Sequence, residues 1–151
     1  MKFERTTFVP AGLPEVFAFF GAQENLGVLT PPEVRFRVVR GPGRQLREGD
    51  RIEYRMRVFG LPFRWVSHIS LWRDGEAFTD AQERGPLRSW LHTHSFRAVS
   101  GGVEMHDHVD YELPFGFLGR FFGGWLVRRK LEEIFDYRGE ATRQRFGDRK
   151  T

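Results

Sequence analysis

Hydrophobic and polar residues along this 151-residue chain repeat with two periods, and these periods predict its secondary structure. Between residues 34 and 113 apolar and polar side chains alternate, which is typical of strands that bury one face. Turn sequences such as Asp74-Gly75 and Gly101-Gly102 interrupt the alternation. The short connections favour sequential antiparallel pairing. The expected strands are Val34–Val39, Arg51–Phe59, Phe63–Arg73, Glu76–Arg84, Arg88–Val99 and Val103–Leu113.

Other elements are expected on either side of this region. A strand, Lys2–Val9, precedes a helix whose apolar residues recur at i, i+3, i+4 and i+7 between Leu13 and Phe20. A second short helical segment is expected at Glu24–Leu29, and a long helix, Phe117–Arg145, ends the chain. This order predicts one α+β domain over residues 1–151 with a curved, seven-stranded antiparallel sheet and a long C-terminal helix.

The long helix carries two apolar stripes on different sides. The early stripe consists of Phe117, Leu118, Phe121, Phe122 and Trp125. The later stripe consists of Val127, Leu131, Ile134 and Phe135. Gly123-Gly124 lies between them, and glycine pairs are common sites of helix kinks. We expect a bend or an interruption there, which would let both stripes face the protein.

Alternation and turn length together predict which side chains share the inner face of the sheet. With two-residue turns, Met56 lies opposite Trp65 on the apolar face, which must be the inner one. Continuing across the sheet places Asp80 opposite His92 and His92 opposite Tyr111. A slip of two residues would keep the same faces. The polar side chains expected on the inner face are Tyr54, Asp80, Gln82, His92, His94, Asp107 and Tyr111.

So many inward polar groups favour a ligand cavity over a simple core, because ligand sites combine apolar walls with a few orienting polar groups. The alternative is that Asp80, His92 and Asp107 pair with one another or with Arg128 or Arg138, and only stabilise the sheet. The candidate ligand-binding residues are Tyr54, Met56, Trp65, Ser67, Gln82, Trp90, Phe96, Met105, Val109, Phe121 and Trp125.

Acid–base catalysis requires a titratable group with an orienting partner. The candidate catalytic groups are His92, His94, Asp80, Asp107 and Tyr111. We expect His92 to be coupled to the Asp80 carboxylate.

A metal site is not expected, although the chain has two His-x-His pairs. His106 and His108 alternate with inward residues and therefore belong to the outer face, so four histidines cannot converge. A three-ligand site of His92, His94 and Asp107 remains as an alternative, since metals accept these ligand types.

Composition narrows the class of protein. Hydrophobic residues make up 40% of the chain, which argues against a disordered chain. Cysteine is absent, so disulfides and thiolate chemistry are excluded. No apolar run is long enough to cross a bilayer, and the first ten residues do not resemble a signal peptide. We therefore expect a cytoplasmic protein, either a monomer or a homodimer.

The C-terminal part of the chain is basic: residues 120–151 contain nine Lys or Arg residues and five Asp or Glu residues. No nucleic-acid-binding motif accompanies this charge, so no nucleic-acid partner is expected. Residues 115–125 (FGFLGRFFGGW) are strongly apolar. They are expected to pack over the sheet, and transient contact with an anionic membrane is the alternative, with Arg120, Arg128 and Arg129 near the head groups.

Several motifs resemble the START-like (SRPBCC) superfamily, in its polyketide cyclase/dehydrase-like group. The resemblance covers about residues 2–146. It is carried by Pro14-Glu15-Val16-Phe17, Asn25-Leu26, Thr30-Pro31-Pro32, Phe78-x-Asp80-x-Gln82-x-x-Gly85-Pro86, Trp90-x-His92-x-His94-x-Phe96 and Asp107-x-Val109-x-Tyr111-x-x-Pro114.

The resemblance implies a helix-grip fold, in which the sheet wraps around the C-terminal helix and a ligand cavity lies between them. Members of this superfamily bind or transform different apolar molecules. Our leading interpretation is binding of a hydrophobic or amphipathic small molecule (lipid, polyketide or aromatic-like) by a non-catalytic carrier, with no cofactor expected. The first alternative is a cyclase or dehydratase that uses the inward His, Asp and Tyr groups. The second is a peripheral membrane or partner-binding module.

Overall fold

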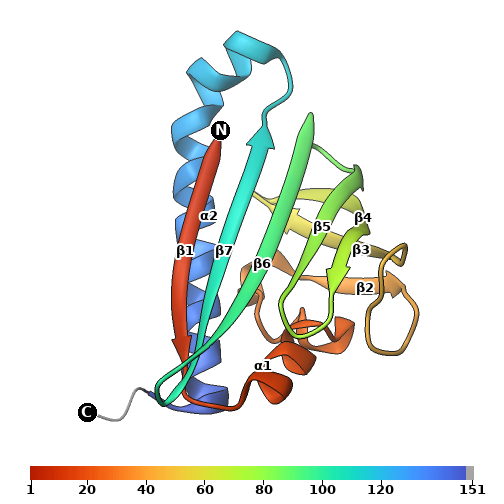
Figure 1. Ribbon diagram of the computed structural model, residues 1–151. Coiled ribbons are helices and arrows are strands. Elements are labelled where there is room, and N and C mark those ends of the chain that lie inside the picture. Colours follow the sequence, from red (N-terminus) through yellow and green to blue (C-terminus); the bar gives the residue numbers. More distant parts are fainter. Residues whose placement is uncertain (149–151) are drawn as a thin grey trace.

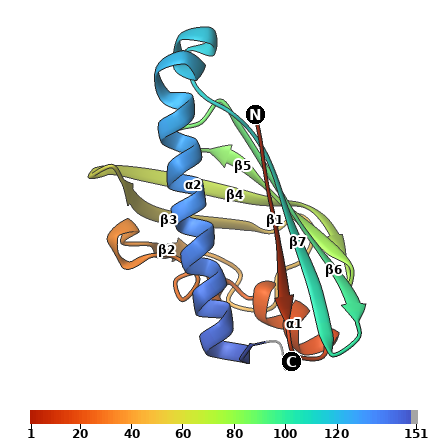
Figure 2. The same cartoon turned by 90° about the vertical axis from the view of Figure 1, so that its left-hand side faces the viewer.

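The computed structural model describes residues 1–148 and consists of a curved antiparallel sheet that wraps around one long helix (Figures 1 and 2). The seven strands lie in the order β1-β7-β6-β5-β4-β3-β2. Their bounds are β1 Lys2–Val9, β2 Arg37–Arg40, β3 Arg51–Val58, β4 Leu61–Arg73, β5 Ala77–Arg84, β6 Ser89–Val99 and β7 Gly102–Glu112. The expected fold class and the antiparallel sheet are confirmed.

The helices cover the inner face and one end of the sheet. Helix α1 (Leu13–Phe20) has Pro14 in its first turn and buries its apolar side. Two single-turn 3₁₀ helices, η1 (Gln23–Asn25) and η2 (Pro32–Val34), follow where one longer helical segment was expected. Helix α2 (Gly116–Phe146) runs along β1 and β7, while β3 and β4 cross it (Figure 2).

The core divides between the two helices. Phe17 and Phe20 of α1 pack with Phe78 and Phe96 of the sheet at the end of the molecule where α1 lies. A second cluster joins β1 and β7 to the second half of α2, through residues that include Phe135. A third cluster, with no member from α1 or α2, includes Ile52, Tyr54 and Trp65 of β3 and β4.

The strand register differs by two residues from the expected one in two hairpins. Val58 pairs with Leu61, so the turn is Phe59-Gly60, and Val99 pairs with Gly102, so the second turn is Ser100-Gly101. In both turns glycine occupies the second position with a positive φ, 74° at Gly60 and 81° at Gly101. The sequence-based register had placed each turn one residue too late. Because the error is two residues, the inward and outward faces are unchanged.

In the β4–β5 hairpin the loop is one residue longer than expected, and a bulge in β4 restores the expected pairing farther along the strand. The Asp74-Gly75 hairpin has a three-residue loop, with Arg73 paired to Ala77, which would shift the register by one residue. The register shifts again between Ile69 and Leu71, so Ile69 pairs with Asp80 as expected. The expected pairing of Asp80 with His92 is also present.

Helix α2 passes through Gly123-Gly124 without a break, so the expected interruption is wrong. The two stripes do not both face the protein. Leu131 and Phe135 of the later stripe are buried, whereas the early stripe is exposed, with Phe121 at 71% and Phe122 at 77% exposure. The N-terminal turns of α2 therefore present the early stripe to solvent, and a bend of the continuous helix at the glycine pair stays a prediction.

We predict that Gly123→Ala raises the free energy of unfolding by roughly 0.5–1 kcal/mol, because alanine is more favourable than glycine inside a helix by about this amount. A Cβ at Gly123 would make only an ordinary contact, 3.6 Å from Leu113 Cδ1. Gly102→Ala is the contrasting variant, since its Cβ would collide with the Val9 carbonyl oxygen, and it should destabilise the protein. Chemical denaturation measures both. A loss of stability in Gly123→Ala would contradict a regular helix at this point.

Candidate ligand-binding site

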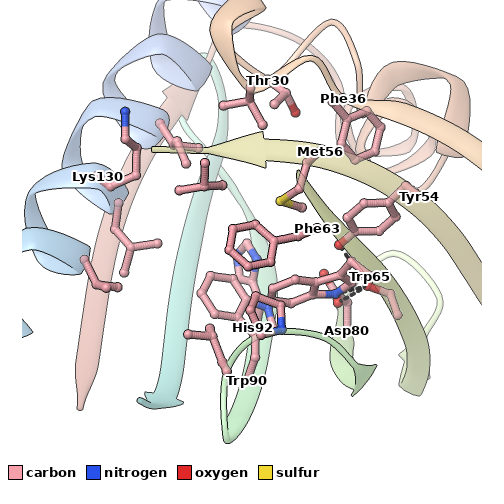
Figure 3. A pocket seen from close by; sticks show the side chains of 18 of the residues that line it. Thr30, Phe36, Tyr54, Met56, Phe63, Trp65, Asp80, Trp90, His92 and Lys130 are labelled. Carbon is pink, nitrogen blue, oxygen red and sulfur yellow. Dashed lines mark hydrogen bonds between the residues drawn. The ribbon is translucent and has the colours of Figure 1, made fainter. Parts of the chain in front are cut away.

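A cavity of about 610 Å³ lies between the inner face of the sheet and α2 (Figure 3). This volume falls in the range of small-molecule sites. Strands β3 to β6 supply one wall, α2 supplies the opposite wall, and the segment from Phe20 to Leu46 closes one side. Most of the lining is apolar, and Met56, Phe63 and Trp65 project into the space.

Several residues proposed from sequence line this cavity, and others do not. Those that line it are Tyr54, Met56, Trp65, Ser67, Asp80, Trp90, His92 and His94. Phe96 and Met105 instead pack in the core around α1, and Val109 packs with β1 and α2. Gln82 bonds the loop after β5: its Nε2 donates to the Leu87 carbonyl (2.8 Å) and its Oε1 accepts from the Leu87 N–H (3.2 Å). Phe121 and Trp125 lie outside the lining, both 71% exposed.

The second half of α2 contributes residues that were missing from the candidate set. Val127, Leu131, Ile134 and Arg138 line the cavity at spacings of four, three and four residues along one side of the helix. The apolar members follow from the later stripe. Arg138 continues the same spacing, and this is the signal that would have placed it in the cavity.

One polar network is centred on the Ser67 hydroxyl. Ser67 Oγ donates to Asp80 Oδ1 at 2.8 Å and accepts from Trp65 Nε1 at 3.1 Å. Tyr54 Oη lies 3.1 Å from the same Oγ. Figure 3 shows these hydrogen bonds on one side of the cavity. Burial raises the pKa of the Asp80 carboxyl. The network fixes the indole and the phenol so that their apolar surfaces face the cavity.

A second network joins both inward histidines to Asp107 of β7. His92 Nε2 lies 2.8 Å from Asp107 Oδ1, and His94 Nδ1 lies 3.2 Å from the same oxygen. The two rings stack with centroids 3.8 Å apart. His92 faces Asp80 across the β5–β6 pair as expected, and its proximity lowers the pKa of the Asp80 carboxyl, but the hydrogen-bond partner of its Nε2 is Asp107. The expected position opposite Tyr111 is wrong, because Val109 pairs with His92.

This network contains one ionised group and one neutral ring. Burial raises the pKa of Asp107, but the hydrogen bond from His92 and the adjacent His94 ring outweigh it and hold this pKa well below its ordinary value. Burial, followed by the nearby His92, lowers the pKa of His94 to about 3. Asp107 is therefore a carboxylate at neutral pH, and His94 is a neutral imidazole. Tyr111, the remaining catalytic candidate, is buried, and its hydroxyl has no hydrogen-bond partner within residues 1–148.

Two groups of side chains have metal-ligand geometry. One is Asp80, His92 and His94 on the inner face; the other is Glu4, His106 and His108, which lie on the outer face as expected. In each group the ligand atoms lie within 4.8 Å of one another. In the inner group a cation would also experience the positive charge of Arg138, which is close enough to lower the pKa of Asp107. This charge disfavours a metal ion in the cavity.

The mouth of the cavity is surrounded by exposed apolar side chains. Phe115 and Phe122 line the cavity and are also 84% and 77% exposed. On the other side of the mouth, Phe59 at the tip of the β3–β4 hairpin is half exposed, and Lys130 of α2 lies over its ring at 5.6 Å. The other exposed apolar residues at this end are Leu61, Phe117, Leu118, Phe121, Trp125 and Leu126. Together with Phe59, Phe115 and Phe122 they form what we call the apolar rim.

No protein-family model matches the chain, and no curated protein matches it. Solved structures do match. Protein CV1439 from Chromobacterium violaceum superposes with a TM-score of 0.75 at 12% identity, covering 99% of each chain. Protein Ms6760 from Mycobacterium smegmatis superposes with a TM-score of 0.74 at 15% identity, covering 99% of this chain and 93% of that one. The chain shares with these proteins the helix-grip fold, an antiparallel sheet wrapped around a long C-terminal helix.

A plant protein extends the likeness. Major latex-like protein 151 from Panax ginseng matches with a TM-score of 0.70 at 11% identity over 97% of both chains. At these identities the helix-grip likeness concerns the fold. The fold supports a site between sheet and helix, and the side chains described above determine what that site binds.

We predict that His94 stays neutral between pH 8 and pH 5. A pKa of about 3 means that the ring takes up a proton only in strong acid. His108 is the internal control: the Glu4 carboxylate and then Asp110 raise its pKa, so it should take up a proton at a higher pH than His94 does. NMR titration of the ring signals measures both. A His94 midpoint above pH 5 would contradict the burial of this ring.

Proposed function

We propose that the protein binds a hydrophobic or amphipathic small molecule in the cavity and acts as a carrier. The observation that supports this is the cavity itself, about 610 Å³ in volume and lined mainly by apolar side chains. A core built only for stability would fill such a space, because protein interiors are close-packed. A lipid, a polyketide or an aromatic compound fits this lining, and a cytoplasmic location is part of the proposal.

Ile134→Glu tests the cavity directly. Ile134 lines the cavity from α2, and a carboxylate there would face an apolar ligand. We expect at least a tenfold loss of affinity for an uncharged solvatochromic dye such as Nile red, equivalent to about 1.4 kcal/mol. Tyr137→Glu is the control on the same helix, since Tyr137 is 36% exposed and lies outside both the lining and the mouth of the cavity. Equal affinity in both variants, with native-like melting curves, would contradict a binding cavity.

Mass spectrometry of small molecules extracted from the purified protein identifies the class of ligand. A compound recovered unchanged after incubation with the protein supports a carrier. A product that has lost water or closed a ring supports the second candidate, a cyclase or dehydratase. The observation in favour of that enzyme is the oriented His92–Asp107 pair beside the cavity, since a carboxylate that holds an imidazole is a common acid–base arrangement.

The apolar rim supports transient contact with an anionic membrane as the step in which the cavity is loaded. Clusters of exposed aromatic and aliphatic side chains of this size are unusual on proteins that work without a partner surface. Arg120, Arg129 and Lys130 lie on the same half of α2, and basic residues next to inserted apolar ones favour anionic head groups. No helix within residues 1–148 has the length and hydropathy to span a bilayer.

We predict that the protein co-sediments with vesicles containing phosphatidylglycerol, and that salt weakens the binding. Replacing Phe117, Phe121 and Trp125 together by serine should reduce binding at least tenfold, because these side chains are exposed in the free protein. A matched control replaces Val28 and Leu91, exposed apolar residues outside the rim. Salt-independent binding, or binding that survives the triple change, would contradict the proposal. A dimer that the triple change dissociates would instead assign the rim to a second copy of the chain.

A further inference from the structure

Arg138 is a cation in the cavity that contacts no anion. Its side chain lines the cavity, and its Nε is buried without a hydrogen-bond partner. The guanidinium carbon lies 5.3 Å from the ring centroid of Phe20 and 5.9 Å from that of Phe135. Among residues 1–148, the other arginines that form ion pairs do so on the surface, and Arg138 forms none within 4 Å.

The carboxylates nearest to this end of the cavity have other partners. Asp107 lies against His92 and His94, and Asp80 Oδ1 accepts the hydrogen bond from Ser67. Arg138 is close enough to affect both carboxylates electrostatically, but it bonds neither. His94 is neutral and adds no second positive charge beside Arg138. The guanidinium therefore has free donors in a largely apolar space, which is costly unless a bound group supplies an acceptor.

Arg138 lies far from the apolar rim. Phe122 and Arg138 both line the cavity and are 16 residues apart on α2, which corresponds to about 24 Å along the helix axis. The side chains between them on the same wall include Val127, Leu131 and Ile134, all apolar. The cation at the rim end, Lys130, is paired with Glu133, whereas Arg138 at the other end of the lining is unpaired within residues 1–148.

We propose that Arg138 binds the carboxylate of an amphipathic acid whose apolar part extends along α2 toward the rim. This inference rests on the proposed ligand-binding function and names the class of ligand. A guanidinium offers parallel N–H donors that match the two oxygens of a carboxylate. The apolar walls accept the rest of the molecule. Neutral ligands of the same shape lack the group that satisfies Arg138.

Dodecanoate and 1-dodecanol test this assignment, because they differ mainly in the head group. Their affinities are measured by displacement of Nile red from the full chain at pH 8, where the acid is ionised. We expect the wild-type protein to bind dodecanoate at least tenfold more tightly than dodecanol. Arg138→Gln should remove this preference and leave dodecanol affinity within about threefold. Arg143→Gln, an exposed arginine paired with Glu140 and outside both the lining and the rim, should leave both affinities unchanged.

The outcomes separate the two proposals. If dye and dodecanol bind but dodecanoate is no tighter, or if Arg138→Gln leaves its affinity unchanged, the assignment of Arg138 is overturned while ligand binding stands. If dye, alcohol and acid all fail to bind, the proposed function itself is overturned. If Arg138→Gln does not fold, Arg138→Lys replaces it. Lysine keeps the charge but loses the paired donors, so dodecanoate should lose affinity and dodecanol should not.

Discussion

The ionised carboxylate of Asp107, buried on the inner face of the sheet, is the constraint on which the rest of the site depends. A buried charge must be matched by hydrogen bonds, and here two imidazoles from β6 surround it. The alignment in which His94 pairs with Asp107 brings both rings to one oxygen. Phe78 stacks on His94 at 4.3 Å and Phe135 packs on His92 at 5.6 Å, so the same centre positions β5 and α2.

Much of the fold could be predicted because alternation reports the face of each strand directly. The seven strands, their antiparallel pairing and the facing of Asp80 and His92 all follow from it. The strand register depends on which residues form each turn, and the residue types near a turn do not determine this. A glycine pair such as Gly101-Gly102 shows that a turn is near, but not which glycine adopts the positive φ. The resulting two-residue error placed Tyr111 opposite His92, where Val109 lies, and so moved Asp107 away from the two histidines.

The site was less predictable than the sheet. A helical stripe shows that apolar residues share a side, but not that another element covers that side. Phe121 and Trp125 were therefore assigned to the cavity although they lie outside it. Arg138 was considered only as an internal ion-pair partner. It continues the spacing of the cavity-lining residues of α2, but a search for apolar residues passes over a charged side chain. Whether a buried cation lacks a partner depends on three-dimensional contacts, and no sequence pattern contains this information.

The bulge in β4 has a consequence for how this chain should be aligned with others. Before it, Trp65, Ser67 and Ile69 face the cavity; beyond it, Trp72 pairs with Phe78 and packs against Phe17 of α1. One strand thus contributes side chains both to the cavity and to the core around α1. The extra residue at the bulge reverses which residue numbers, odd or even, face inward. A gap-free comparison with a homologue that lacks this residue would equate cavity positions with surface positions along half the strand. Structure-guided gaps should therefore be placed at Ser70.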